Sequence, residues 1–122
     1  MVENEIFELI KGDTYERNII IEKYTSEISQ MFFSVKSKET DKRVILQKSL
    51  DNGITLMDID DDKRSYQIFI DSTDTDNMKT GDYFFDVEII TPTKTIPIKR
   101  TIVKGTFRLN TEITTTDNER GA

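Results

Sequence analysis

The residues that the sequence lacks exclude several classes of chemistry. It contains no cysteine, no histidine and no tryptophan. Without histidine there is no Ser-His-Asp or Cys-His catalytic arrangement and no histidine-ligated zinc, and without cysteine there is no disulfide and no thiolate nucleophile. The 5 glycines do not cluster into a phosphate-binding loop. We therefore expect a protein that is not an enzyme and that holds no cofactor.

The chain is acidic and has no long apolar run. Its net charge is −6 and its pI is near 4.7, which disfavours nucleic acid, because phosphate backbones bind basic faces. No apolar stretch approaches the roughly 20 residues that span a bilayer, and the acidic first residues lack the basic flank of a secretory signal. We expect no nucleic-acid or membrane partner, and synthesis and folding in a cytoplasm.

Hydrophobic and polar side chains alternate along most of the chain. A period of two marks strands with one buried and one solvated face, as in antiparallel sheets. An early strand near residues 14–24 places Tyr15, Arg17, Ile19 and Ile21 on one side. In three later strands the residues expected to face the core are Met31, Phe33, Val35, Tyr66, Ile68, Ile70, Tyr83, Phe85, Val87 and Ile89.

Turn residues separate these runs at fairly even spacing. Asn52-Gly53 is typical of a tight hairpin, here between strands at 44–50 and 54–57. Gly12-Asp13 and Thr80-Gly81-Asp82 precede two other strands. About seven or eight short strands result, a pattern typical of a sandwich or a barrel. The fold class is therefore all-β, predicted as an antiparallel immunoglobulin-like β-sandwich.

One short helical turn is expected between the strands at 66–71 and 83–90. Thr73 is placed to cap it, with Asp76 three residues on, and Gly81 to end it. Tyr83 then stands near the start of the following strand, where immunoglobulin-like folds often carry a tyrosine bonded to upstream backbone. The alternative is that Tyr83 is an ordinary core aromatic.

The last strand region changes parity. Ile96 and Ile98 have one parity and Val103, Phe107 and Leu109 the other, which predicts a bulge or break near residues 100–102. Gly105 inside this strand predicts close approach of another backbone. Residues 111–122 lose periodicity and are expected to be disordered or ordered only by a partner. We therefore divide the chain into a β-sandwich domain at 1–110 and a polar C-terminal tail.

Two charged groups are candidate sites. Asp58, Asp60 and Asp62 supply alternate carboxylates, the hard oxygen ligands that calcium requires, although the alternative is a solvated acidic turn. The C-terminal third is locally basic, which favours either a surface complementary to the acidic flank of a neighbouring copy or a solvated strand face. Its basic residues are Lys94, Lys99, Arg100, Lys104 and Arg108.

The order of several motifs resembles a known family. These motifs are Lys11–Arg17, Phe32–Ser37, Leu46–Ser49 with Gly53–Thr55, Tyr66–Ile70 with Asp71–Thr75, Gly81–Glu88 and Val103–Phe107. Across roughly residues 9–114 the sequence resembles the N-terminal domain of phage baseplate upper proteins and related small phage tail proteins of Gram-positive hosts. In that family the domain usually heads a longer chain with helical or receptor-binding parts, whereas this chain stops at 122, so we expect a stand-alone module.

The resemblance implies an immunoglobulin-like sandwich that acts as a non-enzymatic virion structural protein, in the tail, baseplate, neck or capsid surface. It implies other virion proteins as partners, a homo-oligomer or multimer, and location in the virion. Large aromatics on the polar face of strands favour burial by a partner; the alternative is that a second sheet or a loop of the same chain covers them. The candidate interface residues are Phe32, Phe69, Phe84, Arg100, Lys104 and Arg108. A carbohydrate- or cell-surface-binding β-sandwich module is the alternative.

Overall fold

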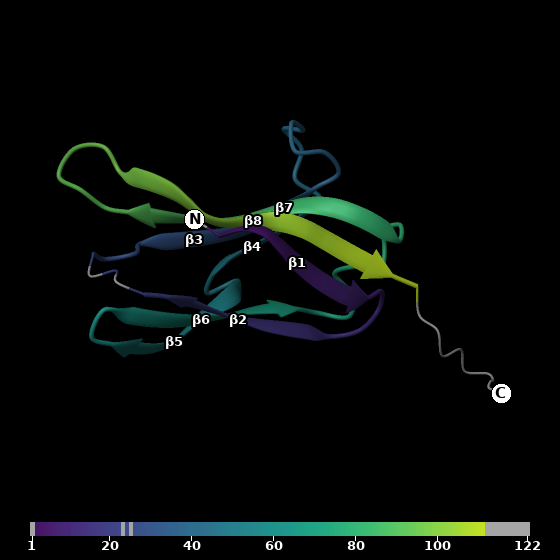
Figure 1. Ribbon diagram of the computed structural model, residues 1–122, viewed down its shortest axis with the longest axis horizontal. Coiled ribbons are helices and arrows are strands. Elements are labelled where there is room, and N and C mark those ends of the chain that lie inside the picture. Colours follow the sequence, from purple (N-terminus) through teal and green to yellow (C-terminus); the bar gives the residue numbers. More distant parts are fainter. Residues whose placement is uncertain (1, 23, 25, 112–122) are drawn as a thin grey trace.

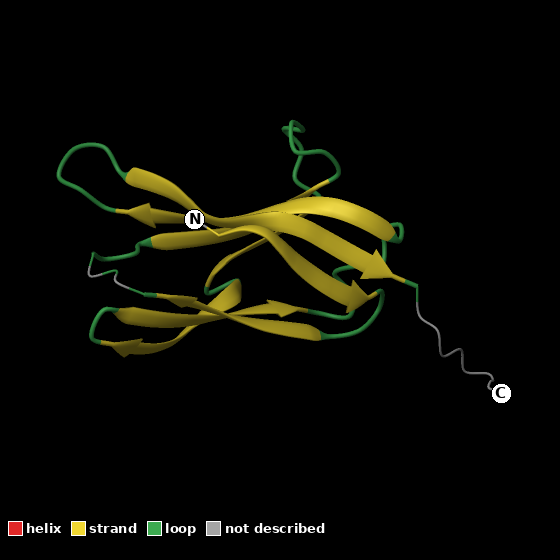
Figure 2. Cartoon of the chain, in the orientation of Figure 1, coloured by secondary structure: helices red, strands yellow, loops and turns green. Residues whose placement is uncertain are grey.

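The structure, a computed structural model, describes residues 2–22, 24 and 26–111. These residues form 8 strands and no helix (Figure 1, Figure 2). The strands are β1 (Val2–Ile10), β2 (Tyr15–Ile21), β3 (Gln30–Lys36), β4 (Leu46–Leu50), β5 (Gly53–Asp60), β6 (Lys63–Ile70), β7 (Gly81–Thr91) and β8 (Ile98–Asn110). The all-β prediction is confirmed, and no helix long and apolar enough to cross a membrane occurs in the described residues.

The strands belong to one 8-stranded sheet in the order β1-β8-β7-β3-β4-β5-β6-β2. The sheet folds over between β4 and β5, so that β5, β6 and β2 lie beneath the other strands and the whole nearly closes into a barrel (Figure 2). Most neighbours are antiparallel, as predicted, but β1 runs parallel to β8 and the short contact between β4 and β5 is also parallel.

Alternate side chains from both layers fill the interior. The predicted core positions of β3 and β6 are all buried, as are Phe85, Val87 and Ile89 of β7, while Tyr83 is half-buried. Four phenylalanines from four strands pack at the centre, with ring centroids 4.4 to 6.1 Å apart. They are Phe7, Phe33, Phe85 and Phe107. Burial of this alternating set provides the main driving force for closing the sheet.

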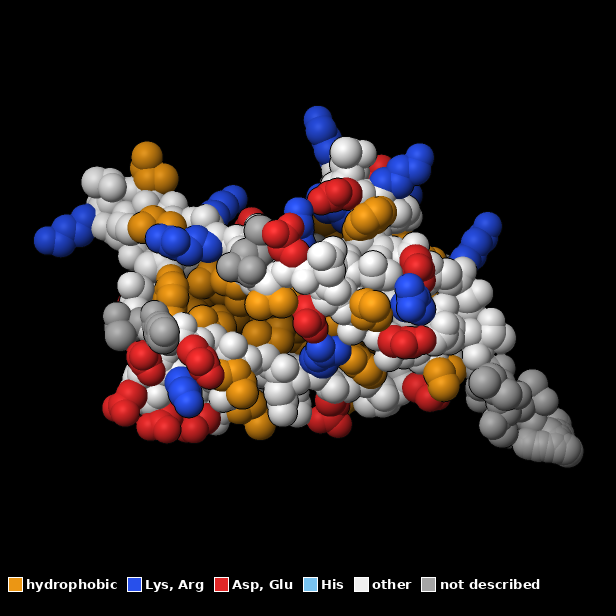
Figure 3. Space-filling model, in the orientation of Figure 1, with side chains coloured by type: hydrophobic (Ala, Val, Ile, Leu, Met, Phe, Trp, Pro, Cys, Tyr) orange, Lys and Arg blue, Asp and Glu red, His pale blue; other side chains and the backbone are white. Residues whose placement is uncertain are grey.

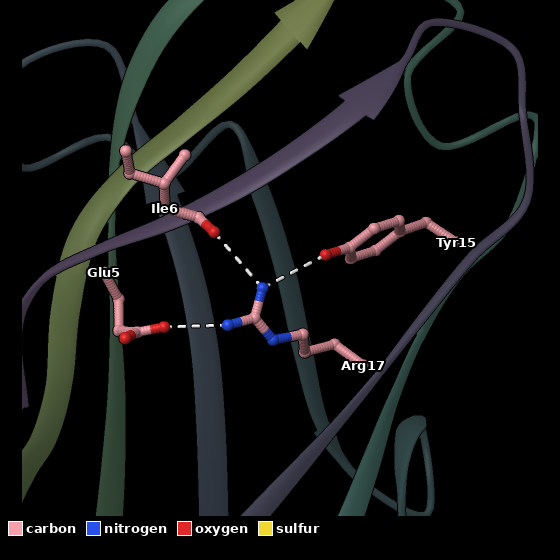
Figure 4. Close-up of polar contacts among 4 residues, drawn as sticks. All are labelled: Glu5, Ile6, Tyr15 and Arg17. Carbon is pink, nitrogen blue, oxygen red and sulfur yellow. Dashed lines mark hydrogen bonds and ion pairs between the residues drawn. The ribbon is translucent and has the colours of Figure 1, made fainter.

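The side chain of Arg17 joins the two edge strands of the sheet, β1 and β2 (Figure 4). The guanidinium of Arg17 on β2 forms an ion pair with Glu5 at 2.7 Å and donates to the backbone oxygen of Ile6 at 3.2 Å, both on β1. The same group donates to the Tyr15 hydroxyl and lies 4.6 Å from the ring centroid of Phe7. Arg17 therefore caps the seam between the layers.

The sequence did not predict strand β1, yet this strand covers the edge of β8. The pairing shifts by one residue between Val2 and Glu5, and Asn4 adopts a positive φ of 62° there. A Cβ on Gly105 would lie 1.9 Å from the backbone oxygen of Glu5. The predicted close approach of another backbone at Gly105 is thus confirmed, and β1 is that backbone.

The predicted Asn52-Gly53 hairpin is wrong. Strands β4 and β5 contact each other in parallel, with Ser49 opposite Gly53 and Leu50 opposite Ile54. The positive φ angles fall on Asp51 (64°) and Gly53 (98°), so the turn redirects the chain into the other layer instead of reversing it. Ile54 then pairs with Ile68 of β6 in the lower layer, and burial of both residues outweighs the local turn preference.

The predicted helical turn after Thr73 is not confirmed, because residues 72–77 form turns. Asp71 takes the capping role that was assigned to Thr73: its carboxylate accepts from the Thr73 amide, and the carboxylate of Asp74 accepts from the Asp71 amide. Thr75 points inward, is fully buried and accepts a hydrogen bond from the Gly12 amide at 3.0 Å. This inward anchor ties the loop to the β1–β2 turn.

Two local predictions for β7 and β8 are confirmed. The hydroxyl of Tyr83 donates to the backbone oxygen of Lys79, upstream of β7. In the β7–β8 pairing, Val87 is opposite Val103 and Glu88 is opposite Thr101, so Ile102 is the extra residue of a bulge. Strand β8 ends at Asn110. Except for Thr111, the predicted tail lies outside the described residues.

Candidate interaction surface

The outer face of β3, β7, β8 and β1 carries two exposed apolar side chains, Phe84 and Ile6, in one cross-strand row. Phe84 stands opposite Thr106 of β8 and Lys36 of β3, and Thr106 in turn stands opposite Ile6 of β1. Phe84 is 46% exposed and Ile6 is 44% exposed. Because their chain neighbours Phe85 and Phe7 are buried, the strand period forces Phe84 and Ile6 outward.

A pocket of about 300 Å³ opens beside Phe84. The irregular start of β1 forms one wall, since Asn4 lines the pocket at the point where the β1–β8 register shifts. Its lining combines two phenylalanines, Phe84 and Phe85, with side chains of both charges. The lining includes Glu3, Asn4, Lys36, Phe84, Asp86 and Lys104. Such a surface fits a partner side chain with an apolar body and a polar end.

Asp86 lies at the centre of the charges around this pocket. It faces Lys104 on β8 and Ser34 on β3. Burial raises the pKa of Asp86 above its ordinary value, and the negative charge of Glu88 raises it further, whereas Lys36 and Lys104 oppose both effects. Desolvation therefore outweighs the two cations, and the carboxylate gains from a partner that supplies a hydrogen-bond donor.

Two of the predicted basic interface residues are already paired within the chain. Lys104 lies 3.4 Å from Glu39 and 3.8 Å from Glu3, across the mouth of the pocket. Arg108 binds Asp82 through two nitrogens at 2.9 and 3.2 Å, and this guanidinium holds the pKa of Asp82 below its ordinary value. Lys104 thus belongs to the pocket, whereas Arg108 belongs to a separate pair on the same sheet.

The other predicted interface residues do not form one patch with the pocket. Phe32 is half-buried on the outer face, between Ser49 and Glu88 of the neighbouring strands. Phe69 is 40% exposed but lies on β6, in the other layer. Arg100 is exposed at the start of β8. The structure therefore brings Phe84 and Lys104 together and separates them from Phe69 and Arg100.

The calcium candidates lie on and just after β5. Asp58 and Asp60 are exposed on the strand, and Asp62 follows in the turn to β6. The described residues contain no group of three carboxylates arranged to hold a metal ion. The backbone oxygen of Asp62 instead accepts a hydrogen bond from the Tyr24 amide.

Sequence reasoning missed the residues around Asp86 and a second exposed surface. Lys36 and Asp86 were not singled out, because their placement beside Phe84 depends on the β3–β7 register. Ile96 is 78% exposed, Met57 is 55% exposed and Ile59 is 52% exposed. Pro92 and Pro97 flank Ile96 and were a usable signal, since proline marks segments outside a regular ladder.

No protein-family model matches the sequence, and no relative was found among curated proteins. The resemblance to phage baseplate and tail proteins therefore rests on the motifs quoted above.

Proposed function

We propose that this chain is a non-enzymatic structural protein of a bacteriophage or phage-like particle, in the tail or baseplate, that works as an assembly module. Other virion proteins are its partners, and the virion is its location. The observation that carries the proposal is the exposed Phe84 beside a mixed-charge pocket, on the outer face of a sheet whose inner face is fully packed. Large exposed aromatics next to concave polar surfaces are typical of protein contacts.

We further propose that the fold is an immunoglobulin-like sandwich. The bond from the Tyr83 hydroxyl to the Lys79 backbone oxygen supports this, because it has the form of the tyrosine corner found in such domains. The two facing layers of strands in Figure 2 also support it.

Mass spectrometry of purified particles tests the proposed function. Particles are isolated from bacteria that encode this chain, and the chain is expected as a component with a fixed copy number that reports the symmetry of its position. Its absence from intact particles contradicts the proposal.

A matched pair of variants tests the surface. Phe84→Ala is expected to reduce incorporation into particles, because it removes the apolar wall of the pocket. Ile20→Ala is the control, since Ile20 is 60% exposed on β2 in the other layer. Equal incorporation of both variants contradicts the assignment of the pocket as the contact.

The alternative is a carbohydrate- or cell-surface-binding module. The same pocket favours it, because an aromatic face beside carboxylates and lysines also suits a sugar ring. A glycan array read with wild type and Phe84→Ala distinguishes the two: sugar binding that Phe84→Ala abolishes supports the alternative, and an array without signal removes it.

A further inference from the structure

Two hairpins extend from the same end of the molecule. One, the arm, is residues 92–100, which connect β7 to β8 and begin β8; the other, the acidic hairpin, is residues 56–62 at the end of β5. The arm belongs to the upper layer and the acidic hairpin to the lower layer, and both point to the left in Figure 1. This end therefore presents two projections, and the described part of the connection between β2 and β3 lies between them (Figure 1).

Both projections carry exposed apolar side chains. On the arm, Ile96 is 78% exposed and Ile98 is 41% exposed; on the acidic hairpin, Leu56 is 44%, Met57 is 55% and Ile59 is 52% exposed. Figure 3 shows further hydrophobic side chains gathered in the hollow between the projections. Scattered exposed apolar residues are ordinary, but their concentration at one end marks a surface that gains from being covered.

The two projections have opposite charge. Lys94, Lys99 and Arg100 lie on the arm and Asp58 and Asp60 on the acidic hairpin. Within the described part of the chain, none of these five forms an ion pair. Figure 3 shows lysine and arginine side chains on the upper projection and acidic side chains massed on the lower one. The positive charge of the arm is thus complementary to the negative charge of the acidic hairpin.

The arm also leaves backbone unpaired. Strand β8 pairs with β1 only from Val103 onward, so the preceding stretch of β8 pairs with β7 alone among the described strands. An open strand edge beside exposed isoleucines is a surface that sheet proteins normally cover.

We propose that this end binds a second copy of the chain, with the arm of each copy on the acidic hairpin of the other. A two-fold axis at right angles to the long axis brings both contacts together, because the projections lie at one end but on opposite layers. A contact between the two arms is excluded as the main contact, because Lys99 and Arg100 of one copy would face the same positive charges on the other copy. This inference rests on the proposed function, an assembly module, and identifies one of its partners as a second copy of the chain.

Sedimentation equilibrium of the purified chain, at about 50 mM and about 0.5 M salt, tests the pairing. We expect a dimer at low salt whose dissociation constant rises with salt, because opposite charges hold the ends together. The arm variant, Lys99→Glu with Arg100→Glu, is expected to weaken the dimer about tenfold or more. The control is Lys38→Glu with Lys42→Glu, an equal charge change in the exposed 37–45 loop, which leaves the dimer intact.

The hairpin variant, Asp58→Lys with Asp60→Lys, is likewise expected to weaken the dimer about tenfold or more. An equimolar mixture of the arm and hairpin variants then regains dimers, because both contacts in the mixed pair join opposite charges. Circular dichroism checks that each variant is folded. A monomeric wild type, or a mixture that stays monomeric, overturns the pairing. Particle mass spectrometry remains a separate test. If the chain is monomeric but is found in particles, only the pairing is contradicted. If the chain dimerises but is absent from particles, only the proposed function is contradicted.

Discussion

Arg17 on β2 lies 2.7 Å from Glu5 on β1, and this pair joins the two ends of a sheet that are otherwise farthest apart in strand order. Figure 4 shows the guanidinium spanning the gap, with one nitrogen on the Glu5 carboxylate and the other between the Ile6 backbone oxygen and the Tyr15 hydroxyl. The contact uses the planar, multiply donating group of arginine, which lysine cannot reproduce. One polar side chain on the core-facing side of β2 thus holds the seam.

Arg17→Ala is expected to lower the free energy of unfolding by about 1–2 kcal/mol. The variant loses a half-exposed ion pair, a hydrogen bond to a backbone oxygen and the contact over the Phe7 ring. Urea unfolding measures the change, and hydrogen exchange is expected to quicken in β1. Arg43→Ala, at an exposed position in the 37–45 loop, is the control and stays within about 0.5 kcal/mol of wild type. Equal effects of the two changes contradict the role of Arg17.

Gly105→Ala is expected to destabilise the fold by about 1–3 kcal/mol, because the new methyl group collides with the backbone of Glu5. Thermal unfolding measures it. The same substitution in a chain lacking residues 2–5 is expected to cost far less, since the colliding backbone is gone. If the cost is the same in both backgrounds, β1 does not limit this position.

Tyr83→Phe is expected to cost about 0.5–1.5 kcal/mol by removing the hydrogen bond to the Lys79 backbone oxygen while keeping the ring that packs edge-on against Phe107. Chemical denaturation reports the loss. Tyr15→Phe serves as the comparison, because the Tyr15 hydroxyl accepts only the longer 3.3 Å bond from Arg17. A larger loss from Tyr15→Phe than from Tyr83→Phe contradicts the importance of the corner.

Asp86→Asn is expected to change how stability depends on pH. Since the pKa of Asp86 is raised in the folded chain, the folded state binds this proton more tightly, and the carboxyl lowers stability as pH rises from its ordinary value of 3.8 through the raised value. The variant therefore matches wild type in acid and exceeds it at neutral pH, by less than about 1 kcal/mol because the group is partly exposed. Unfolding curves at several pH values measure the difference; a pH-independent difference contradicts it.

The core was largely predictable because strand period is a local property. The alternation in β3, β6 and β7 assigned the buried set before any pairing was known, and the parity change near residue 102 located the bulge. The candidate site was predictable only in part. Phe84 was identifiable as an aromatic on the polar side of its strand, and Lys104 as one of a group of basic residues. Their proximity to Asp86 in one pocket, however, depends on pairing among β3, β7 and β8.

The failures have a common physical cause. The Asn52-Gly53 turn was assigned from local preference, whereas the chain there crosses between layers to bury Ile54. Strand β1 was missed because its first half is acidic and exposed, and only its pairing with β8 makes it a strand. In both cases a long-range contact overrode the local signal.

The sequence by itself determined the all-β class, the inward set of side chains and the places where the chain bends, because these follow from side-chain alternation and backbone freedom within a few residues. Tertiary structure alone decided which edges meet, through Arg17, and that Phe84, Asp86 and Lys104 share one pocket. It also decided that the basic arm and the acidic hairpin lie at the same end. Strand order and layer crossing are set by the summed burial of residues distant in the chain, which no local pattern encodes.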